Sequence, residues 1–307
     1  MKELPVVSVV MPAYNAGLYI EESIGSVIAQ TYPYWELIVV DDGSTDDSRR
    51  KVETLAAADA RVRYIYQENG RQGKARNAGI AMARGGLVAF LDADDLWVPE
   101  MLEQQLALLD SSKADLVFGY IHYLDPEGRY QAGTGVPDYD SLEGKEGFIR
   151  LLKLNYIPIF TVLAQKQRIL DAGCFRESTA LQFGEDFDLW LRMLLQGARF
   201  ELNRRYLAWY RLHPQQSIRN TGSKYLQVLE MISLLPNMPG IAGEKRKARC
   251  LWIRRALVNQ KQLDVAGIRR LIHYLPSWYT RVLSLFFSYF LPAGLLRKAV
   301  YQLSYYS

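Results

Sequence analysis

The chain has 307 residues, enough for one large domain or two smaller ones. Its hydrophobic content of 49% and charged content of 23% are ordinary for a soluble globular protein, and it lacks the long apolar segments of a multi-span membrane protein. Two cysteines, Cys174 and Cys250, exclude a disulfide framework. Neither has a Cys or His neighbour at zinc-site spacing, which favours a reducing compartment.

Charge is distributed unevenly along the chain. The segment from Glu244 to Ser307 holds twelve Lys and Arg residues against two acidic residues, whereas the residues before it hold 25 basic and 31 acidic side chains. A mildly acidic body with a net charge of −6 therefore precedes a tail with a net charge of +10. The tail is also rich in Trp, Tyr and Phe, and this combination predicts an anionic partner.

Strand and helix patterns alternate over about the first 110 residues. Compact apolar runs predict buried strands, the first of them stopped by Pro12, and apolar residues at helical spacing predict helices between them. The strands are expected over 6–11, 36–40, 62–66 and 88–91, and the helices over 20–28, 46–58, 73–83 and from 99 onward. This alternation predicts an α/β fold with a Rossmann-like, mostly parallel central sheet and helices on both faces.

The pattern changes after residue 115. Longer strands are expected over 115–124, 158–165 and 200–212, with helices over 145–154, 166–172 and 184–195 and a loop over 131–144. We interpret this part as a mixed extension of the first sheet and the residues beyond Thr221 as mostly helical.

The two ends of the chain bear on its location. Residues 1–10 enter an apolar run at once and lack a signal-peptide cleavage region, so a cytoplasmic protein is expected. Near the other end, the fifteen uncharged residues Val282–Leu296 are fewer than the roughly 20 that cross a bilayer. Two interpretations of that segment remain open, a helical hairpin packed on the body or an aromatic segment lying in a membrane interface.

Polar side chains follow three of the predicted strands. They are Tyr14 and Asn15 after the first strand, Asp41 and Asp42 after the second, and Asp92, Asp94 and Asp95 after the fourth. Because the carboxyl ends of parallel strands meet at one edge of a sheet, these side chains are expected to build one pocket. Crowded carboxylates indicate a divalent cation, with a solvated acidic turn as the alternative. The chain has no GxGxxG after its first strand and no P-loop, which weakens a dinucleotide or NTPase site.

Four stretches share their order and spacing with one enzyme family. They are VSVVMPAYN from Val7, VVDDGSTD from Val39, ARNAG from Ala75 and FLDADD from Phe90. On these motifs, over about residues 6 to 120, the chain resembles the family 2 glycosyltransferases of the GT-A fold. The resemblance implies a nucleotide-sugar donor, inversion at the anomeric carbon and a cofactor of Mn²⁺ or Mg²⁺. It suggests a donor-binding half over 1–115, an acceptor-binding half over 116–220 and a basic, aromatic-rich helical region over 221–307.

The resemblance also implies roles for the residues of the first two motifs. The loop after the first strand would cradle the nucleotide base, and its residues are Pro12, Ala13, Tyr14 and Asn15. Asp42 would contact the base, which is uracil if the donor is a UDP-sugar.

The third and fourth motifs would hold the diphosphate and the metal. Asp92 and Asp94 stand where the family has its Asp-x-Asp element, so Asp94 would ligate the metal and Asp92 would lie near the ribose or a metal-bound water. Asp95 is expected to support them or to cap a helix. Arg76 and Asn77 complete the implied donor-binding set, although a basic residue there is also consistent with a solvated helix face.

The acceptor side has fewer signals. Direct displacement needs one carboxylate to accept the acceptor's hydroxyl proton. Glu185 and Asp186 resemble the Glu-Asp pair that supplies the family's general base, which implies Asp186 as this base, with Glu185 as the second candidate. The alternative is that the pair only caps the helix that follows. Residues 210–214 resemble a shorter family element after the last strand. This resemblance implies His213 as a third metal ligand or a diphosphate contact and Arg211 as a partner of phosphate oxygens, with a structural role as the alternative.

The sequence therefore predicts an inverting, metal-dependent glycosyltransferase of the hexosyltransferase type in cell-surface polysaccharide biosynthesis. Its partners would be a nucleotide-sugar donor and a glycan or polyprenyl-linked glycan acceptor, with no nucleic acid. The basic tail is expected to make peripheral contact with the anionic inner face of the cell membrane. The alternatives are a sugar nucleotidyltransferase and a non-catalytic nucleotide-sugar binding module.

Overall fold

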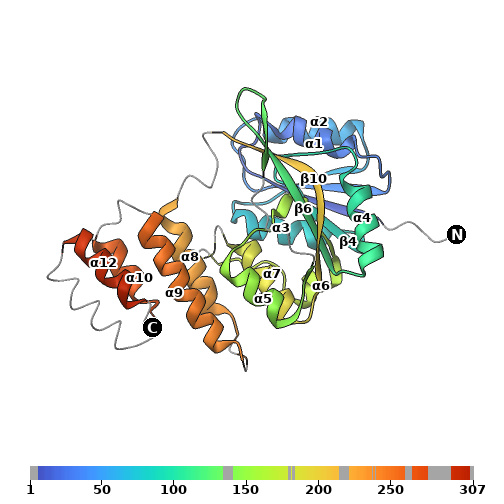
Figure 1. Ribbon diagram of the computed structural model, residues 1–307. Helices are drawn as coiled ribbons and strands as arrows, with labels where there is room; N and C mark the ends of the chain where they lie inside the picture. Colours follow the sequence, from blue (N-terminus) through green and yellow to red (C-terminus); the bar gives the residue numbers. More distant parts are fainter. Residues whose placement is uncertain are drawn as a thin grey trace. The chain divides into compact units, whose positions relative to one another are not determined.

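The computed structural model describes residues 6–133, 141–178, 181, 184–213, 221–236, 238, 240–259, 265–275 and 292–304 (Figure 1). The chain divides into two compact units. The sheet unit comprises residues 1–148, 155–177 and 185–214, and the helical unit comprises residues 149–154, 178–184 and 215–307. Most of the predicted segment Val282–Leu296 lies outside the described residues, so both of its interpretations stay predictions.

A sheet of ten strands, counted over the described residues, forms the centre of the sheet unit. Four parallel strands in the order β3-β2-β1-β4 make up one half of the sheet. Strand β9 lies between β4 and β6 and is antiparallel to both. Strand β6 is also paired with β10, and these two strands are parallel. The bounds are β1 Val7–Ala13, β2 Trp35–Asp41, β3 Val62–Tyr66, β4 Leu87–Phe90, β5 Leu96–Trp97, β6 Leu116–Leu124, β7 Tyr130–Gly133, β8 Ser141–Leu142, β9 Leu163–Gln165 and β10 Phe200–Arg211. The predicted α/β class with a central, mostly parallel sheet is confirmed.

Helices cover the parallel strands on both faces. The connections between these strands place α1 and α2, which contact each other, on one face of the sheet and α3 on the other (Figure 1). The bounds are α1 Ile20–Ile28, α2 Ser48–Ala58, α3 Arg71–Met82, α4 Met101–Ser112, α5 Gly144–Lys153, α6 Lys166–Asp171 and α7 Glu185–Leu195. Helix α3 lies so close to β1 that a Cβ atom at Gly79 would overlap the side chain of Val10.

The strand predicted to stop at Pro12 continues to Ala13. The carbonyl of Val10 accepts a hydrogen bond from Leu91 beyond β4, and the carbonyl of Ala13 accepts one from Asp42 beyond β2. Because backbone polar groups alternate between the two neighbours, the nitrogen of Pro12 faces the β4 side, where the paired register ends at Val10. The missing N–H of Pro12 therefore removes no hydrogen bond between strands.

The strand predicted over 158–165 is largely wrong. Ile159–Thr161 forms a short 3₁₀ helix, and only β9 is extended. The Thr161 hydroxyl donates to the carbonyl of Pro158 at 2.8 Å and accepts from the N–H of Gly119 at 3.1 Å. A threonine hydroxyl that bonds nearby backbone groups competes with the hydrogen bonds between strands. At Thr161 this competition favours the 3₁₀ helix over a strand. The sequence patterns also missed the short strands β5, β7 and β8.

The helical unit contains α8 Thr221–Leu234, α9 Ala242–Asn259, α10 Val265–Ile272 and α12 Ala293–Leu303. Helix α9 packs against both α8 and α12, and α10 packs against α12. Trp252 and Ile253 of α9 are buried in the core of this unit. Among the helices of the described residues, none is both long enough and apolar enough to cross a membrane.

Candidate active site

The loops after β1 and β2 are fastened to each other by Asn15. Its side-chain oxygen accepts the N–H of Thr45 at 2.8 Å, and its own N–H donates to the hydroxyl of Ser44 at 2.9 Å. Asn15 has a φ of +51°, a left-handed conformation that asparagine tolerates better than most residues. The neighbouring Tyr14 is exposed, whereas Pro12 and Ala13 are buried within β1. Of the predicted base cradle, the structure therefore presents Tyr14 and Asn15 to solvent.

Asp42 joins the end of β2 to the start of α3. One carboxylate oxygen accepts bonds from Gln67 Nε2 at 2.6 Å and the N–H of Gly70 at 2.8 Å, and the other accepts the N–H of Arg71 at 2.7 Å. The side chain is buried and satisfies amide groups at a helix N-terminus, where negative charge is stabilised. The second oxygen, with one protein donor, keeps a lone pair for a further donor.

The turn after β4 presents three carboxylates in three different environments. Asp92 accepts a hydrogen bond from Arg76 at 2.8 Å, and Asp94 lies 2.9 Å from Nε2 of His213. Asp95 is buried, and one of its oxygens accepts the N–H of Arg211 at 2.9 Å while the other has no protein partner within the described parts of the chain. Burial and mutual repulsion raise the pKa of Asp94, and they raise the pKa of Asp95 further. This turn therefore carries negative charge that its protein neighbours do not fully balance.

Arg76 connects this turn to α7. Its guanidinium donates to Asp92 at 2.8 Å and to Glu185 at 2.7 Å, and the side chain is only 2% exposed. It lies over the ring of Phe175, with its central carbon 5.6 Å from the ring centroid. The sequence predicted Arg76 as a donor contact, and the structure places it beneath the site as a buried bridge between two carboxylates.

Glu185 and Asp186 open α7 with different exposure. Glu185 is buried, and burial together with the charge of Asp186 raises its pKa to about 7 despite the contact with Arg76. Burial also raises the pKa of Asp186, whose carboxylate accepts a weak hydrogen bond from Asn155 Nδ2 at 3.4 Å. Asp186 is half-buried, so it keeps a face toward solvent that Glu185 lacks. This difference in exposure favours Asp186 over Glu185 as a group that meets an acceptor.

His213 and Arg211 enclose Tyr19 of the loop before α1. The His213 ring packs against the Tyr19 ring at 4.8 Å between centroids, and the Arg211 guanidinium lies 4.9 Å from the same ring. Arg211 also donates to the carbonyl of Asp94 at 2.9 Å and to Glu22 at 2.5 Å. Arg211 thus fixes the backbone beside Asp94, and its side chain is largely covered.

Asn77, the other predicted donor contact of α3, holds the loop that contains Phe175 and Glu177. Its amide donates to the carbonyl of Phe175 at 2.8 Å and to Glu177 at 2.9 Å, and its oxygen accepts the N–H of Phe175 at 3.0 Å. Sequence reasoning missed the contacts of Asn155 and Tyr19, because neither residue lies in a motif or at an informative spacing. Only the folded chain brings them to Asp186 and His213.

The glycosyl transferase family 2 profile matches residues 8–171, more than half of the chain. The chain belongs to this family. TuaG of Bacillus subtilis, a glycosyltransferase assigned to teichuronic acid biosynthesis, is 33% identical over 210 residues, covering 68% of this chain and 79% of TuaG. WfgD of Escherichia coli, a UDP-Glc:alpha-D-GlcNAc-diphosphoundecaprenol beta-1,3-glucosyltransferase, is 32% identical over 228 residues, covering 72% of this chain and 83% of WfgD. Other relatives are longer, and the match covers 36% of an uncharacterised glycosyltransferase of Rickettsia felis.

Solved glycosyltransferase structures share the fold. The first 349 residues of Staphylococcus aureus TarS, in complex with UDP, align with a TM-score of 0.66 at 19% identity, covering 98% of this chain and 92% of that one. The mannosyltransferase PcManGT of Pyrobaculum calidifontis, in complex with GDP-Man and Mn²⁺, aligns with a TM-score of 0.62 at 15% identity, covering 99% and 85%. This family 2 glycosyltransferase therefore has the predicted GT-A type of fold.

The residues of the β4 turn are compatible with a divalent cation. Carboxylate and imidazole groups are suitable ligands for Mn²⁺, and Asp94 and His213 already lie in contact. The unpartnered oxygen of Asp95 and the raised pKa of Asp94 indicate negative charge that a cation would balance. Within the described ranges, however, no three His, Cys, Asp or Glu side chains form a ready metal cluster. Of the three predicted ligands, Asp94 and His213 lie together, while Asp92 pairs with Arg76.

Proposed function

We propose that this family 2 glycosyltransferase transfers one sugar from a UDP-sugar to a hydroxyl of a lipid-linked glycan, with inversion at the anomeric carbon. The observation that carries the proposal is the bridge from Asp92 through Arg76 to Glu185. It joins the strand-end turn implied in donor binding to the helix that begins with Glu185 and Asp186. Direct displacement requires that the bound donor and the general base are held in a fixed arrangement, and this bridge connects the residues proposed for the two roles.

The relatives support the choice of substrates. WfgD uses UDP-Glc and an acceptor on diphosphoundecaprenol, and TarS has been crystallised with UDP and with UDP-GlcNAc. PcManGT binds GDP-Man, so the fold alone does not select the base. The assignment of TuaG to teichuronic acid biosynthesis and the acceptor of WfgD favour a role in cell-surface polysaccharide assembly.

In the proposed mechanism, Tyr14 and the free lone pair of Asp42 contact the nucleotide base. Asp186 accepts the proton of the acceptor hydroxyl as that oxygen attacks the anomeric carbon, and the nucleoside diphosphate departs from the opposite face. Asp94 and His213 would hold Mn²⁺ or Mg²⁺, which when bound would neutralise charge on the diphosphate leaving group. Arg76 keeps Asp92 and Glu185 in place without touching substrate.

The proposal is tested by release of nucleoside diphosphate from a panel of donors, with and without Mn²⁺, using a diphosphoundecaprenol-linked GlcNAc as acceptor. Asp186→Asn is expected to lower the rate about 100-fold or more, because it removes a general base. Asp171→Asn is the matched control, since Asp171 is an exposed residue at the end of α6. Product linkage read by NMR should be β for an α-linked donor.

Two results would contradict the proposal. A wild-type rate for Asp186→Asn would exclude Asp186 as the base. Donor binding in calorimetry without turnover on any acceptor of a broad panel would instead favour the alternative of a non-catalytic nucleotide-sugar binding module.

A further inference from the structure

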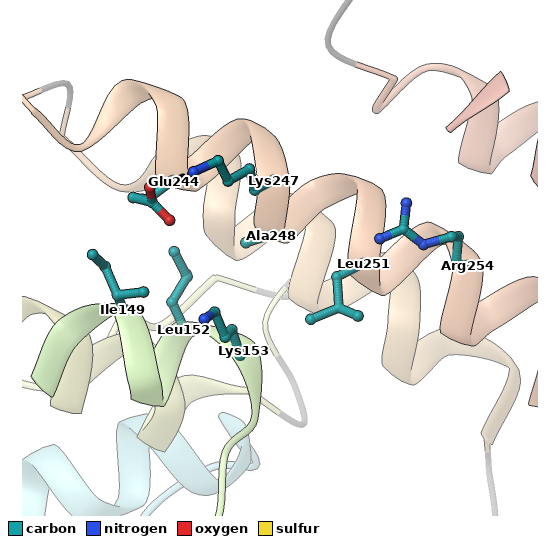
Figure 2. A pocket seen from close by; sticks show the side chains of 8 residues that line it. All are labelled: Ile149, Leu152, Lys153, Glu244, Lys247, Ala248, Leu251 and Arg254. Atoms are coloured by element: carbon teal, nitrogen blue, oxygen red, sulfur yellow. Dashed lines mark hydrogen bonds and ion pairs between the residues drawn. The ribbon is translucent and has the colours of Figure 1, made fainter. Parts of the chain in front are cut away.

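A groove in the helical unit lies between the end of α5 and the length of α9 (Figure 2). Its floor is apolar, and Figure 2 shows Leu152 of α5 and Leu251 of α9 pointing into the space between the two helices. Ile149 and Ala248 complete that floor. The groove has a volume of about 180 Å³, below the roughly 300 Å³ at which small-molecule pockets begin, so it is too small to enclose a nucleotide-sugar.

The rim of the groove is cationic. It carries Lys153, Lys247 and Arg254 against one acidic residue, Glu244. Lys247 forms an ion pair with Glu244 at 2.9 Å but is 73% exposed, so the pair is open to solvent. The rim therefore has a net positive charge, and its residues other than Lys153 lie in the segment 244–307, whose net charge is +10. An apolar floor inside a cationic rim complements a molecule with an apolar chain and an acidic head.

The groove is held in shape by α9 itself. The indole N–H of Trp252 donates to the carbonyl of Leu152 at 3.0 Å, and Arg255 donates to the carbonyl of Lys153. These bonds satisfy carbonyl groups at the C-terminal end of α5 that lack helical partners. Arg255 also lies over the Trp252 ring, with its guanidinium carbon 4.9 Å from the ring centroid. The two helices are thus tied together along one side of the groove.

Apolar side chains are also exposed elsewhere in this unit. Among the large hydrophobic residues that are exposed, Leu154, Leu234, Val258 and Leu295 belong to the helical unit. Cations that attract an anionic surface, combined with exposed apolar side chains, are the two features that bind a protein to the interface of a bilayer.

We propose that the helical unit docks on a bilayer containing acidic phospholipid, with the groove between α5 and α9 taking the upper part of one acyl chain and its cationic rim facing the phosphates. This proposal concerns a binding surface distinct from the catalytic residues. It does not depend on the sugar that the enzyme transfers.

The test uses the full chain and sedimentation with vesicles of phosphatidylcholine, with or without phosphatidylglycerol. The wild-type chain should bind only the mixed vesicles and be released by salt. The triple variant Lys153→Gln/Lys247→Gln/Arg254→Gln should bind about 100-fold more weakly, at roughly a fivefold loss for each cation. Leu251→Gln leaves the charge unchanged and should weaken binding about tenfold, because it places a polar group on the apolar floor.

A matched control separates the groove from net charge. Arg49→Gln/Arg50→Gln/Arg129→Gln removes the same charge from exposed arginines of the sheet unit and should bind like the wild type. Circular dichroism and donor turnover on a soluble acceptor should match the wild type for every variant. A loss that is equal in both triple variants would overturn the proposal, as would wild-type binding that ignores phosphatidylglycerol. Unchanged vesicle binding with altered self-association in light scattering would assign the groove to a second copy of the chain instead.

Discussion

Arg76 and Glu185 are 109 positions apart in the chain, yet their side chains form an ion pair of 2.7 Å in the interior of the sheet unit. The same guanidinium also holds Asp92 at 2.8 Å. One buried cation thus serves two carboxylates, with Asp186 adding a third negative group nearby. These charges raise the pKa of Arg76, so it stays protonated at every pH at which the chain is folded. Burial and the charge of Asp186 outweigh the effect of this cation, so the pKa of Glu185 remains high.

Replacing Arg76 with methionine is expected to destabilise the protein by about 3–5 kcal/mol, because it leaves the buried Glu185 and the partly exposed Asp92 without their cation. Urea unfolding followed by circular dichroism measures this change. The double variant Arg76→Met/Glu185→Leu should recover part of the loss, since it removes one of the uncompensated acids. Arg49→Met is the control, because Arg49 pairs with Glu53 on the exposed surface and its replacement should change the free energy of unfolding little. Equal losses for Arg76→Met and Arg49→Met would contradict a buried bridge.

The raised pKa of Glu185 gives stability a defined dependence on pH. The folded chain holds the Glu185 proton up to a pH of about 7, whereas the unfolded chain releases it near 4.5. Between these values the folded state binds more protons, so the free energy of unfolding should fall as pH rises, by roughly 3 kcal/mol at most. Glu185→Gln keeps an acceptor for Arg76 and should flatten this slope in urea titrations. A slope that is unchanged in Glu185→Gln would show that other groups cause it.

Catalysis should depend on pH in the opposite sense. Asp186 accepts a proton only when ionised, and burial raises its pKa above the ordinary aspartate range. The ratio kcat/KM should therefore rise with pH and level off at a higher pH than an ordinary aspartate would give. Asn155→Ala removes the hydrogen bond that favours the ionised form, so its rate profile should shift to higher pH. Gln167→Ala, on the exposed face of α6, is the control and should leave the profile in place. A shift to lower pH for Asn155→Ala would contradict the assignment.

Much of the donor side could be predicted from the sequence because local signals define it. The strands β1, β2 and β4 are compact apolar runs, and the carboxyl ends of parallel strands lie at one edge of a sheet, so the placement of Asp42 and Asp92 at that edge follows from topology. The family motifs then indicate that these strand-end residues belong to a glycosyltransferase. What local patterns do not encode is which side chain faces substrate and which faces its own protein.

Arg76 and Asn77 illustrate this limit. Both lie in the ARNAG motif, for which the resemblance implies donor contacts, and in the folded chain each bonds a residue about a hundred positions later. Such pairing depends on where α7 and the loop at Phe175 settle in the folded chain. The strand expected from Pro158 failed for a similar reason, because the Thr161 hydroxyl bonds Gly119 of β6 across the fold.

Close packing of α3 on β1 predicts opposite effects for two helical glycines. Gly79→Ala would place a methyl group into Val10 and should destabilise the protein by about 1–3 kcal/mol. Gly25→Ala in α1 meets no atom within 4 Å and should stabilise it by about 0.5–1 kcal/mol, because alanine favours helix over glycine. Thermal unfolding measures both. Adding Val10→Ala to Gly79→Ala should be less costly than the sum of the two single changes. A neutral Gly79→Ala would contradict the tight contact.

The contact between His213 and Asp94 leads to a prediction about metal dependence. If the two side chains hold the cation, His213→Ala should raise the Mn²⁺ concentration needed for half-maximal donor turnover by at least about tenfold, because it removes one ligand. His273→Ala is the matched control, since His273 is exposed after α10 in the helical unit. Calorimetric titration of Mn²⁺ with UDP present gives a second readout that does not require turnover. Unchanged Mn²⁺ dependence in His213→Ala would assign His213 to packing against Tyr19, where its ring already lies 4.8 Å from the tyrosine ring.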